Sequence, residues 1–266
     1  MFSGIAVGTS EVVSQALGAH NGKDAGKALH TSIAFSLLGG AASKRKYRKW
    51  RRKMIDKNEV IEFFDRCAPY WNADMVRSDE IIDKILDNAG VKAGSRVLDV
   101  ACGTGVLIPD YLKREVASVT GVDISPEMIK IAVETHKAEN IHFICGDVEE
   151  LNFGEAFDAI VIYNAFPHFP DAKRLIARLS NALAPGGILT VAHGMSRERI
   201  NMHHSGAAKH VSADLMPAEE LAEIFKKHLT ITDIISNDTM YQVAGKESTT
   251  SAGEHTFGWC SPSLFA

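Results

Sequence analysis

The sequence predicts an α/β fold, with a doubly wound, mostly parallel seven-stranded sheet that ends in an antiparallel C-terminal hairpin at one edge. Segments typical of strands and of helices alternate between residues 56 and 247. The first strand, RVLDVA, is largely apolar, which is typical of a parallel strand buried on both faces. Only a short turn separates the last two strands, LTITDIIS and TMYQVAGK, and a parallel crossover needs a far longer connection.

Helix signals fill the intervals between the strands. Ser78 is the expected cap of a helix over residues 79–89, in which apolar residues recur on one face. Ser125 is the expected cap of another helix, because Pro126 suits the first helical position. A third helix is expected over residues 171–183. The remaining parallel strands are expected at SVTGVDI, IHFICGD, FDAIVIYN and GILTVAH.

Three parts are expected along the chain. Residues 1–55 form an N-terminal extension that is rich in Gly, Ala and Ser and to which no fold is assigned. Residues 56–247 form the α/β domain, with an insertion at 194–216 before its last helix. Residues 248–266 lack periodicity and are expected to form a loose tail.

Charge is unevenly distributed along the chain. The formal net charge is −4, yet residues 44–53 hold eight Lys or Arg and no acid, so the remainder sums to −12. An acidic body argues against nucleic acid as the main substrate, because phosphate contact needs a positive surface. The basic run has three interpretations: a solvated arm, a peripheral contact with an anionic membrane, or non-specific contact with nucleic acid.

The cysteines and the N-terminus bear on location. Cys67, Cys102, Cys145 and Cys260 are widely spaced and form no CxxC pair, which argues against a zinc site or a disulfide framework. No basic segment precedes an apolar core at the N-terminus, so no secretory signal is expected. We therefore expect a cytoplasmic protein, with peripheral membrane contact through residues 44–53 as the alternative. The sequence does not indicate an oligomeric state.

The strongest local signal is VLDVACGTG, at residues 97–105. Gly103 and Gly105 allow the backbone to approach a ligand where a side chain would clash. The segment follows the first strand, at the edge where doubly wound sheets bind ligands. A dinucleotide fingerprint would need glycine where Ile108 stands, and no Gly-Lys-Ser/Thr follows for a P-loop.

Acids end the next two strands. Asp123 lies 24 residues after Asp99, and Asp147 lies 24 residues after Asp123. A carboxylate at Asp123 can accept hydrogen bonds from two ribose hydroxyls. Asp147 can accept one from an adenine amino group, with Ile124 and Val148 flanking the purine. Asp123 also suits a nicotinamide enzyme, whereas Asp147 and Ile108 argue against that alternative.

Together these residues resemble the class I (Rossmann-like) methyltransferases that use S-adenosyl-L-methionine (SAM), of the small-molecule type to which the quinone-biosynthesis enzymes belong. The resemblance covers residues 58–245. It implies SAM as the cofactor and a small molecule as the methyl acceptor. The positions to which it assigns cofactor contacts are Asp99, Ala101, Gly103, Gly105, Asp123, Ile124, Asp147, Val148, Tyr163 and Tyr70.

Some positions depart from neighbouring subfamilies. Tyr163 and Asn164 follow the fourth strand, where quinone-pathway enzymes carry Arg-Asn. The Asn-Pro-Pro-Tyr motif of amino- and nucleobase-methylating enzymes is absent there, which argues against methylation of nucleic acid or protein glutamine. The segment FFDRCAPYWN resembles a helix that closes over the cofactor, so Tyr70 is either part of a lid or a core aromatic. Trp71 is expected in the core.

Methyl transfer depends mainly on alignment and exclusion of water, and a base is needed only if the acceptor must lose a proton. The candidate bases are His168, His193, His203 and His204, of which His193 and then His168 are favoured. Their spacing with carboxylates does not predict a metal site. The alternative function is a SAM-binding sensor or partner subunit without transferase activity, which the N-terminal extension suggests.

Overall fold

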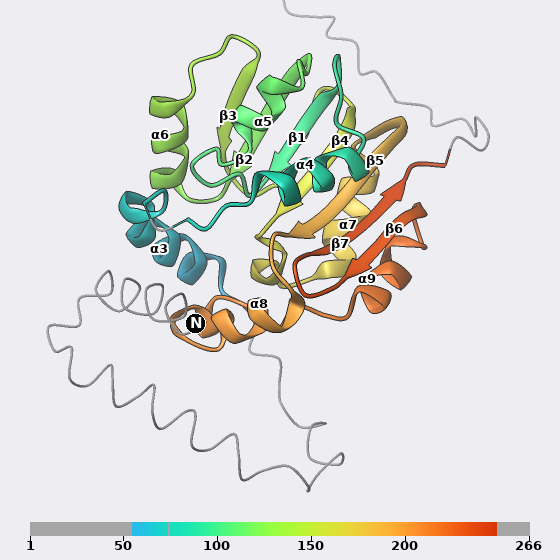
Figure 1. Ribbon diagram of the computed structural model, residues 1–266. Helices are drawn as coiled ribbons and strands as arrows, with labels where there is room; N and C mark the ends of the chain where they lie inside the picture. Colours follow the sequence, from blue (N-terminus) through green and yellow to red (C-terminus); the bar gives the residue numbers. More distant parts are fainter. Residues whose placement is uncertain (1–54, 74, 249–266) are drawn as a thin grey trace, which may run out of the picture.

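A computed structural model of the chain describes residues 55–73 and 75–248 (Figure 1). The basic run at 44–53 lies outside the described residues, as do Cys260, almost all of the predicted N-terminal extension, and the predicted tail after residue 248. The division of the chain into three parts at 55 and 247 therefore stays a prediction.

One seven-stranded sheet organises the domain, in the order β3-β2-β1-β4-β5-β7-β6. Strands β1 to β5 run parallel, and β7 runs antiparallel to both β5 and β6. The fold class predicted from the sequence is confirmed, with β7 inside the sheet and β6 at its edge. The strands are β1 (Arg96–Val100), β2 (Ser118–Asp123), β3 (Ile141–Cys145), β4 (Phe157–Tyr163), β5 (Leu183–His193), β6 (Thr230–Ser236) and β7 (Tyr241–Lys246).

Helices cover both faces of the sheet (Figure 1). The α-helices are α3 (Lys57–Cys67), α4 (Asp79–Asn88), α5 (Ile108–Lys113), α6 (Pro126–Thr135), α7 (Ala172–Ser180), α8 (Arg197–His204) and α9 (Ala218–Phe225). Short 3-10 turns are η2 (Ala68–Tyr70), η3 (Phe166–His168) and η4 (Ala207–His210). No helix in the described ranges has both the length and the apolar character that crossing a bilayer requires.

Two of the predicted helices begin where expected, but only one of the two predicted capping serines makes a side-chain capping hydrogen bond. The Ser125 side chain accepts a hydrogen bond from the Met128 N–H at the start of α6. Ser78 precedes α4, but its side chain makes no capping bond. The predicted helix at 171–183 ends at Ser180, because the chain then turns into β5. That strand begins before the predicted GILTVAH, with a register shift where Leu183 pairs with β4.

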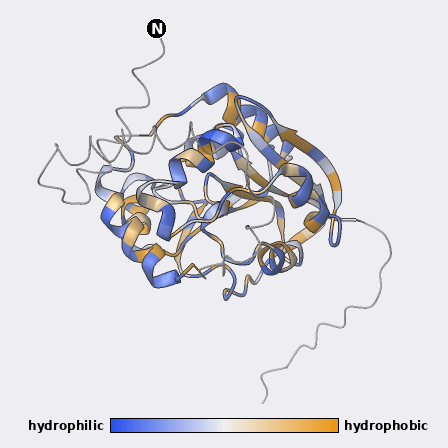
Figure 2. Ribbon diagram, turned by 90° about the horizontal axis from the view of Figure 1, so that it is seen from below, coloured by the Kyte–Doolittle hydropathy of each residue, from blue (hydrophilic) through white to orange (hydrophobic). Residues whose placement is uncertain are grey.

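The central strands are buried on both faces. Leu98 and Ile160 contribute to the core on one side of the sheet, and Val97 and Val161 to the core on the other, all fully buried. Alternation of side chains along β1 and β4 produces this division, and each such side chain contributes about 1.5–3 kcal/mol of burial free energy. The surrounding helices carry both hydrophilic and hydrophobic residues (Figure 2), and the buried residues of α7, such as Leu175, Ile176 and Leu179, have the three- to four-residue spacing of an amphipathic helix.

Candidate functional site

A cavity of about 400 Å³ lies at the carboxyl ends of β1 to β4, where α3, η2 and α8 cover it. Of the predicted cofactor residues, nine line the cavity: Tyr70, Asp99, Ala101, Gly103, Asp123, Ile124, Asp147, Val148 and Tyr163. Gly105 does not line it, and of the two favoured bases His168 lines it and His193 does not. Strand ends far apart in sequence therefore meet at one site, as expected for this topology.

The loop after β1 exposes its backbone to the cavity. Ala101, Gly103 and Gly105 all have positive φ angles, of 54°, 56° and 82°. A Cβ placed on Gly103 would meet only Trp71 Nε1, at 3.8 Å, so the space above this residue is open. A Cβ on Gly105 would lie 2.6 Å from the His136 ring. Gly105 therefore shapes the loop from behind, whereas Gly103 faces the site.

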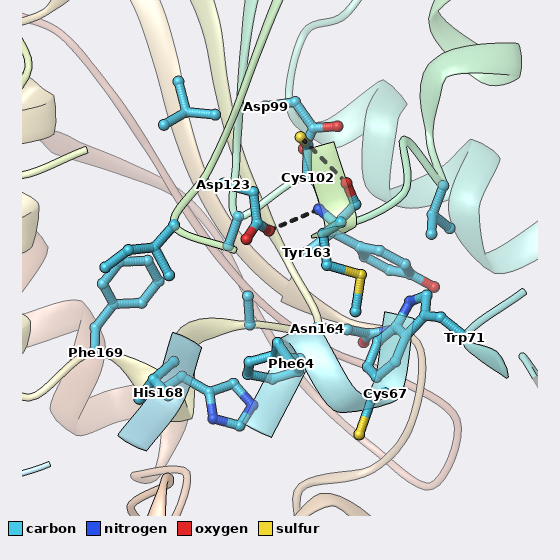
Figure 3. A pocket seen from close by; sticks show the side chains of 18 of the residues that line it. Phe64, Cys67, Trp71, Asp99, Cys102, Asp123, Tyr163, Asn164, His168 and Phe169 are labelled. Atoms are coloured by element: carbon cyan, nitrogen blue, oxygen red, sulfur yellow. Dashed lines mark hydrogen bonds between the residues drawn. The ribbon is translucent and has the colours of Figure 1, made fainter. Parts of the chain in front are cut away.

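Asp123 joins this loop to the next strand. Its Oδ2 accepts a hydrogen bond from the Gly103 N–H at 2.8 Å, and its Oδ1 accepts one from the Ser125 N–H at 2.9 Å (Figure 3). Burial raises the pKa of this carboxyl, while the backbone hydrogen bonds favour its charged form. Each carboxylate oxygen retains a further lone pair, so Asp123 can also accept hydrogen bonds from a ligand diol.

Asp99 is the most deeply buried acid of the cavity, with 2% of its surface exposed. Its Oδ2 has no hydrogen-bond partner among the described residues. Burial first, and then the charge of Asp123, raise the pKa of Asp99 to about 8. A cationic amino group in the cavity would satisfy this oxygen and favour the ionised carboxylate.

Asp147 is engaged by a residue that the sequence did not single out. Lys57, at the start of α3, donates a hydrogen bond to Asp147 Oδ2 and lies 3.3 Å from Glu149 Oε2. Burial lowers the pKa of Lys57, but the two acids outweigh burial and raise it overall. Nothing in the local pattern distinguishes Lys57 from the other surface lysines, because its partners are distant in sequence.

The segment from α3 to residue 73 forms a cover over the predicted cofactor residues. Trp71 lines the cavity and packs edge-on against Phe64, with ring centroids 5.6 Å apart. Asn72 Oδ1 accepts a hydrogen bond from the Thr104 hydroxyl at 2.6 Å, which joins the cover to the loop after β1. Tyr70 lies exposed at the cavity rim. Trp71 is therefore half-buried in the cavity wall over Gly103, and the expectation that it lies in the core is wrong.

The end of β4 is held in an unusual backbone conformation. Asn164 has a φ of 55°, and its side-chain Oδ1 accepts a hydrogen bond from the Gly194 N–H at 3.0 Å. A Cβ on Gly194 would lie 2.6 Å from the Tyr163 hydroxyl, so a larger residue there would displace the end of the Tyr163 side chain. This arrangement fixes Tyr163 and Asn164 against the cavity wall.

His168 lies at the other side of the cavity, opposite Asp99 and Asp123 in the view of Figure 3, and His203 and His204 also line the cavity. The His168 ring contacts Phe64 edge-on at 4.9 Å and His204 at 5.1 Å between centroids. Nδ1 of His168 lies 2.9 Å from the Val211 carbonyl oxygen. Burial lowers the pKa of His168, so its ring is neutral near pH 7.

His193 lies behind these residues rather than in the cavity. It is fully buried, packs edge-on against Tyr241 at 5.9 Å, and has no hydrogen-bond partner for either ring nitrogen among the described residues. Burial, followed by the charges of His204 and His168, lowers its pKa to about 3. His193 is the last residue of β5, as predicted, but its side chain packs into the protein interior and does not line the cavity.

The residues at 55–73 and 75–248 contain no group of three or more His, Cys, Asp or Glu side chains that could hold a metal ion. The fit to a nucleoside cofactor is better supported. One cavity is lined by three groups that suit a nucleoside: the backbone at Gly103, which has open space above it, Asp99, whose Oδ2 has no hydrogen-bond partner among the described residues, and Asp123, which can accept hydrogen bonds from a diol.

Comparison with known proteins agrees with this geometry. The methyltransferase domain family matches residues 97–187. A ubiquinone biosynthesis O-methyltransferase from Coxiella burnetii is 34% identical over 143 residues, which make up 51% of this chain and 61% of that protein. A malonyl-(acyl-carrier protein) O-methyltransferase from Acetivibrio thermocellus is 32% identical over 139 residues, or 51% of this chain and 49% of that protein.

A solved structure shows the same fold. The N-methyltransferase NodS from Bradyrhizobium japonicum, in complex with S-adenosyl-L-homocysteine, has a TM-score of 0.57 at 19% identity, over 72% of this chain and 98% of its own. The predicted resemblance to class I SAM-dependent methyltransferases, including the quinone-biosynthesis group, is confirmed. The chain spans only 61% and 49% of the length of the two curated relatives.

Proposed function

We propose that this chain transfers a methyl group from SAM to a small-molecule acceptor. The observation that carries the proposal is the meeting of Asp99, Asp123 and Asp147, from the ends of three successive strands, in one cavity beside the open backbone of Gly103. The match of residues 97–187 to the methyltransferase domain family supports the same conclusion.

Each acid has a separate task in this proposal. Asp123 accepts hydrogen bonds from the ribose hydroxyls, and Asp147 accepts one from the adenine amino group, with Ile124 and Val148 flanking the ring. Asp99 pairs with the amino group of the methionine part. When bound, SAM supplies a methyl group on a positively charged sulfur.

The acceptor side of the cavity favours an apolar molecule. Met195 and Ile200 line it, and three exposed apolar side chains, Tyr70, Met75 and Val76, form its rim. Exposed apolar side chains that gather at a cavity mouth are typical of a ligand-binding site. The names of both curated relatives specify O-methylation, and we extend transfer to oxygen to this chain as part of the proposal.

The protein's own contribution is alignment and exclusion of water. The cover formed by residues 57–73 and the insertion that contains α8 lie over the cavity, so a bound acceptor is held away from solvent. Correct placement of two reactants alone can supply about 7–11 kcal/mol of the barrier reduction. The buried, packed surroundings of Tyr163 and Phe64 suit this positioning role.

The proposal is tested by incubating the full chain with tritium-labelled SAM and a pooled extract of small metabolites and lipids. We expect label in low-molecular-weight products, and none in added DNA, RNA or protein. The Asp123→Ala variant should lose this transfer. Tight binding of S-adenosylhomocysteine without any transfer would instead favour a SAM-binding sensor or partner subunit.

We also propose a peripheral contact with anionic membranes through residues 44–53. Eight basic residues interleaved with Tyr47 and Trp50 support it, since each basic residue near an anionic surface contributes about 1 kcal/mol. Co-sedimentation of the full chain with phosphatidylserine vesicles tests the contact. Binding that is equal with neutral phosphatidylcholine vesicles, or absent from both, would contradict it.

A further inference from the structure

We propose that Nε2 of His168 accepts the acceptor's proton and that the acceptor is an uncharged molecule that carries a hydroxyl group. The proposal rests on the proposed function and makes it more specific, because it names the base, the nucleophilic atom and the charge class of the acceptor. Four observations on the histidine side of the cavity lead to it.

The first observation fixes the tautomer of His168. A carbonyl oxygen can only accept a hydrogen bond, so the 2.9 Å contact with Val211 requires the hydrogen of the neutral ring on Nδ1. Nε2 then carries the free lone pair. A neutral imidazole whose lone pair is available can act as a general base, and the hydrogen bond at its other nitrogen orients it.

The second observation concerns how firmly the ring is held. Val211 is fully buried and packs with Val60 and Phe63 of α3, and two residues further on the Ala213 N–H donates a hydrogen bond to the Pro167 carbonyl at 2.8 Å. Two hydrogen bonds thus join residues 211–213 of the insertion to η3. Together with the edge-on contact to Phe64, they limit rotation of the His168 ring.

The third observation is the second histidine of the cavity. His204, on α8, lies beside His168, and its Nδ1 is buried without a hydrogen-bond partner among the described residues. Burial, and then the charges of His168 and His203, lower the pKa of His204 to about 4. His193, from β5, and His203, from α8, are other titratable groups near this pair, and burial lowers the pKa of both. The histidines near His168 are therefore neutral near pH 7 and place no positive charge beside its ring.

The fourth observation concerns charge. Among the described residues that line the cavity, Lys57 is the only Lys or Arg, and it pairs with Asp147 and Glu149 on the adenine side. A carboxylate or phosphate on the acceptor side would be buried without a cationic partner, which is strongly unfavourable. An uncharged hydroxyl needs only a hydrogen-bond acceptor, and His168 Nε2 provides one.

The proposed step balances as follows. The acceptor hydroxyl gives its proton to Nε2 of His168 as its oxygen forms a bond to the methyl carbon. The bond from that carbon to sulfur breaks, and its electron pair stays on sulfur, which leaves S-adenosylhomocysteine and a methyl ether. The imidazolium then releases the proton to solvent when the cavity opens.

The first test uses SAM labelled with ¹³C in the methyl group and a metabolite and lipid extract of bacterial cells. The isolated product should be a methyl ether of an uncharged hydroxyl compound, identified by carbon NMR. His168→Gln should lower its formation by roughly 10²- to 10⁴-fold, the range typical of a general base. His228→Gln, an exposed histidine outside the cavity, is the matched control and should retain full activity.

The second test does not depend on turnover. Nitrogen NMR of the chain bound to S-adenosylhomocysteine should show His168 neutral at pH 7, with its hydrogen on Nδ1. Calorimetry should give the same affinity for S-adenosylhomocysteine in His168→Gln as in the wild type, which excludes a collapsed site. The remaining activity of the variant should rise with pH, because ionisation of the acceptor replaces the base.

The outcomes separate the two proposals. A methyl ester, or a methyl group on nitrogen, sulfur or carbon, would overturn the inference and leave the methyltransferase function intact. A His168→Gln variant with wild-type activity, or a hydrogen on Nε2, would also overturn it. No labelled product from a chain that binds S-adenosylhomocysteine would refute the proposed function, and the inference with it.

Discussion

The two sides of the cavity are built in different ways. On the cofactor side, strand ends and the loop after β1 supply the groups, and the backbone N–H groups of Gly103 and Ser125 hold Asp123. On the acceptor side, η3 and the insertion supply them, and Nδ1 of His204 is left without a partner among the described residues. The family match at 97–187 covers the first side and stops before the insertion.

This difference suggests that the two sides of the cavity have separate functions, one in binding the nucleoside and the other in binding the acceptor. Strand ends are fixed by the sheet, so they can hold the same nucleoside in many proteins. Within the insertion the Asn201 side chain bonds to the Leu215 backbone, and the Ala213 N–H bonds to the Pro167 carbonyl of η3. The insertion can therefore change without disturbing the sheet. Changes on the cofactor side should therefore alter nucleoside affinity, and changes on the acceptor side should leave it intact.

A large effect on the cofactor side is expected from Gly105→Ala. The substitution forces a Cβ to within 2.6 Å of the His136 ring at a φ of +82°, so it should distort the loop that carries Gly103. Affinity for S-adenosylhomocysteine should fall by about tenfold or more, equivalent to about 1.4 kcal/mol. The left-handed backbone itself should add a loss of about 1–2 kcal/mol of unfolding free energy.

Gly94→Ala is the matched control for this prediction. Gly94 has a similar φ of +79°, but a Cβ there would meet nothing within 4 Å. We expect the same kind of loss in unfolding free energy with unchanged ligand affinity, measured by urea denaturation and calorimetry. Equal loss of affinity in both variants would contradict a local role for the loop.

The pH dependence of stability tests the buried acid of the cofactor side. The pKa of Asp99 is raised to about 8, above about 3.9 in the unfolded chain, so the folded state binds more protons between these values. Its contribution is fully present below pH 4 and is lost as pH rises towards 8. The slope is at most about 1.4 kcal/mol per pH unit.

Asp99→Asn removes this titration without changing the side chain's shape. The unfolding free energy of the variant, relative to the wild type, should therefore increase from pH 5 to pH 8, as measured by urea denaturation. A difference that does not vary with pH would show that Asp99 is ionised in the folded protein.

A smaller effect is expected from Asn201→Ala, on the acceptor side. Asn201 accepts a hydrogen bond from Leu215 N–H at 2.7 Å and donates one to its carbonyl at 3.3 Å. Their loss should cost about 1–2 kcal/mol and speed hydrogen exchange within the insertion. Affinity for S-adenosylhomocysteine should not change, and a clear drop would break the proposed division between the two sides.

The smallest effect is expected from Lys57→Met. The Lys57 side chain is about a third exposed, so its ion pairs with Asp147 and Glu149 should contribute less than about 1 kcal/mol to stability. Lys226→Met, which breaks an exposed pair with Glu223, is the control. A much larger loss for Lys57→Met, measured by urea denaturation, would show that this pair holds α3 in place.

Much of the cofactor side could be predicted from sequence because its signals are local. Asp123 is the last residue of β2 and Gly103 stands three residues after the end of β1, and strand ends in a parallel sheet meet at one edge. The strand order could not be predicted from the sequence. β7 pairs with both β5 and β6 and so lies between them, and the spacing of the strands along the chain does not encode these pairings.

The acceptor side depends on distant contacts. His193 was favoured because it ends a strand, but the face to which it points is set by packing against Tyr241. His168 is oriented by Val211, 43 residues away, and Lys57 reaches Asp147, 90 residues away. No local pattern carries such information.

The central claim is most directly tested by calorimetric titration of the full chain with S-adenosylhomocysteine, alongside NAD and the Asp123→Ala variant. The account predicts micromolar binding of S-adenosylhomocysteine, no binding of NAD, and about a 100-fold weaker affinity in the variant, since hydrogen bonds to a charged group contribute about 1.5–3 kcal/mol. Binding of NAD in place of S-adenosylhomocysteine, or an affinity that survives loss of Asp123, would contradict it.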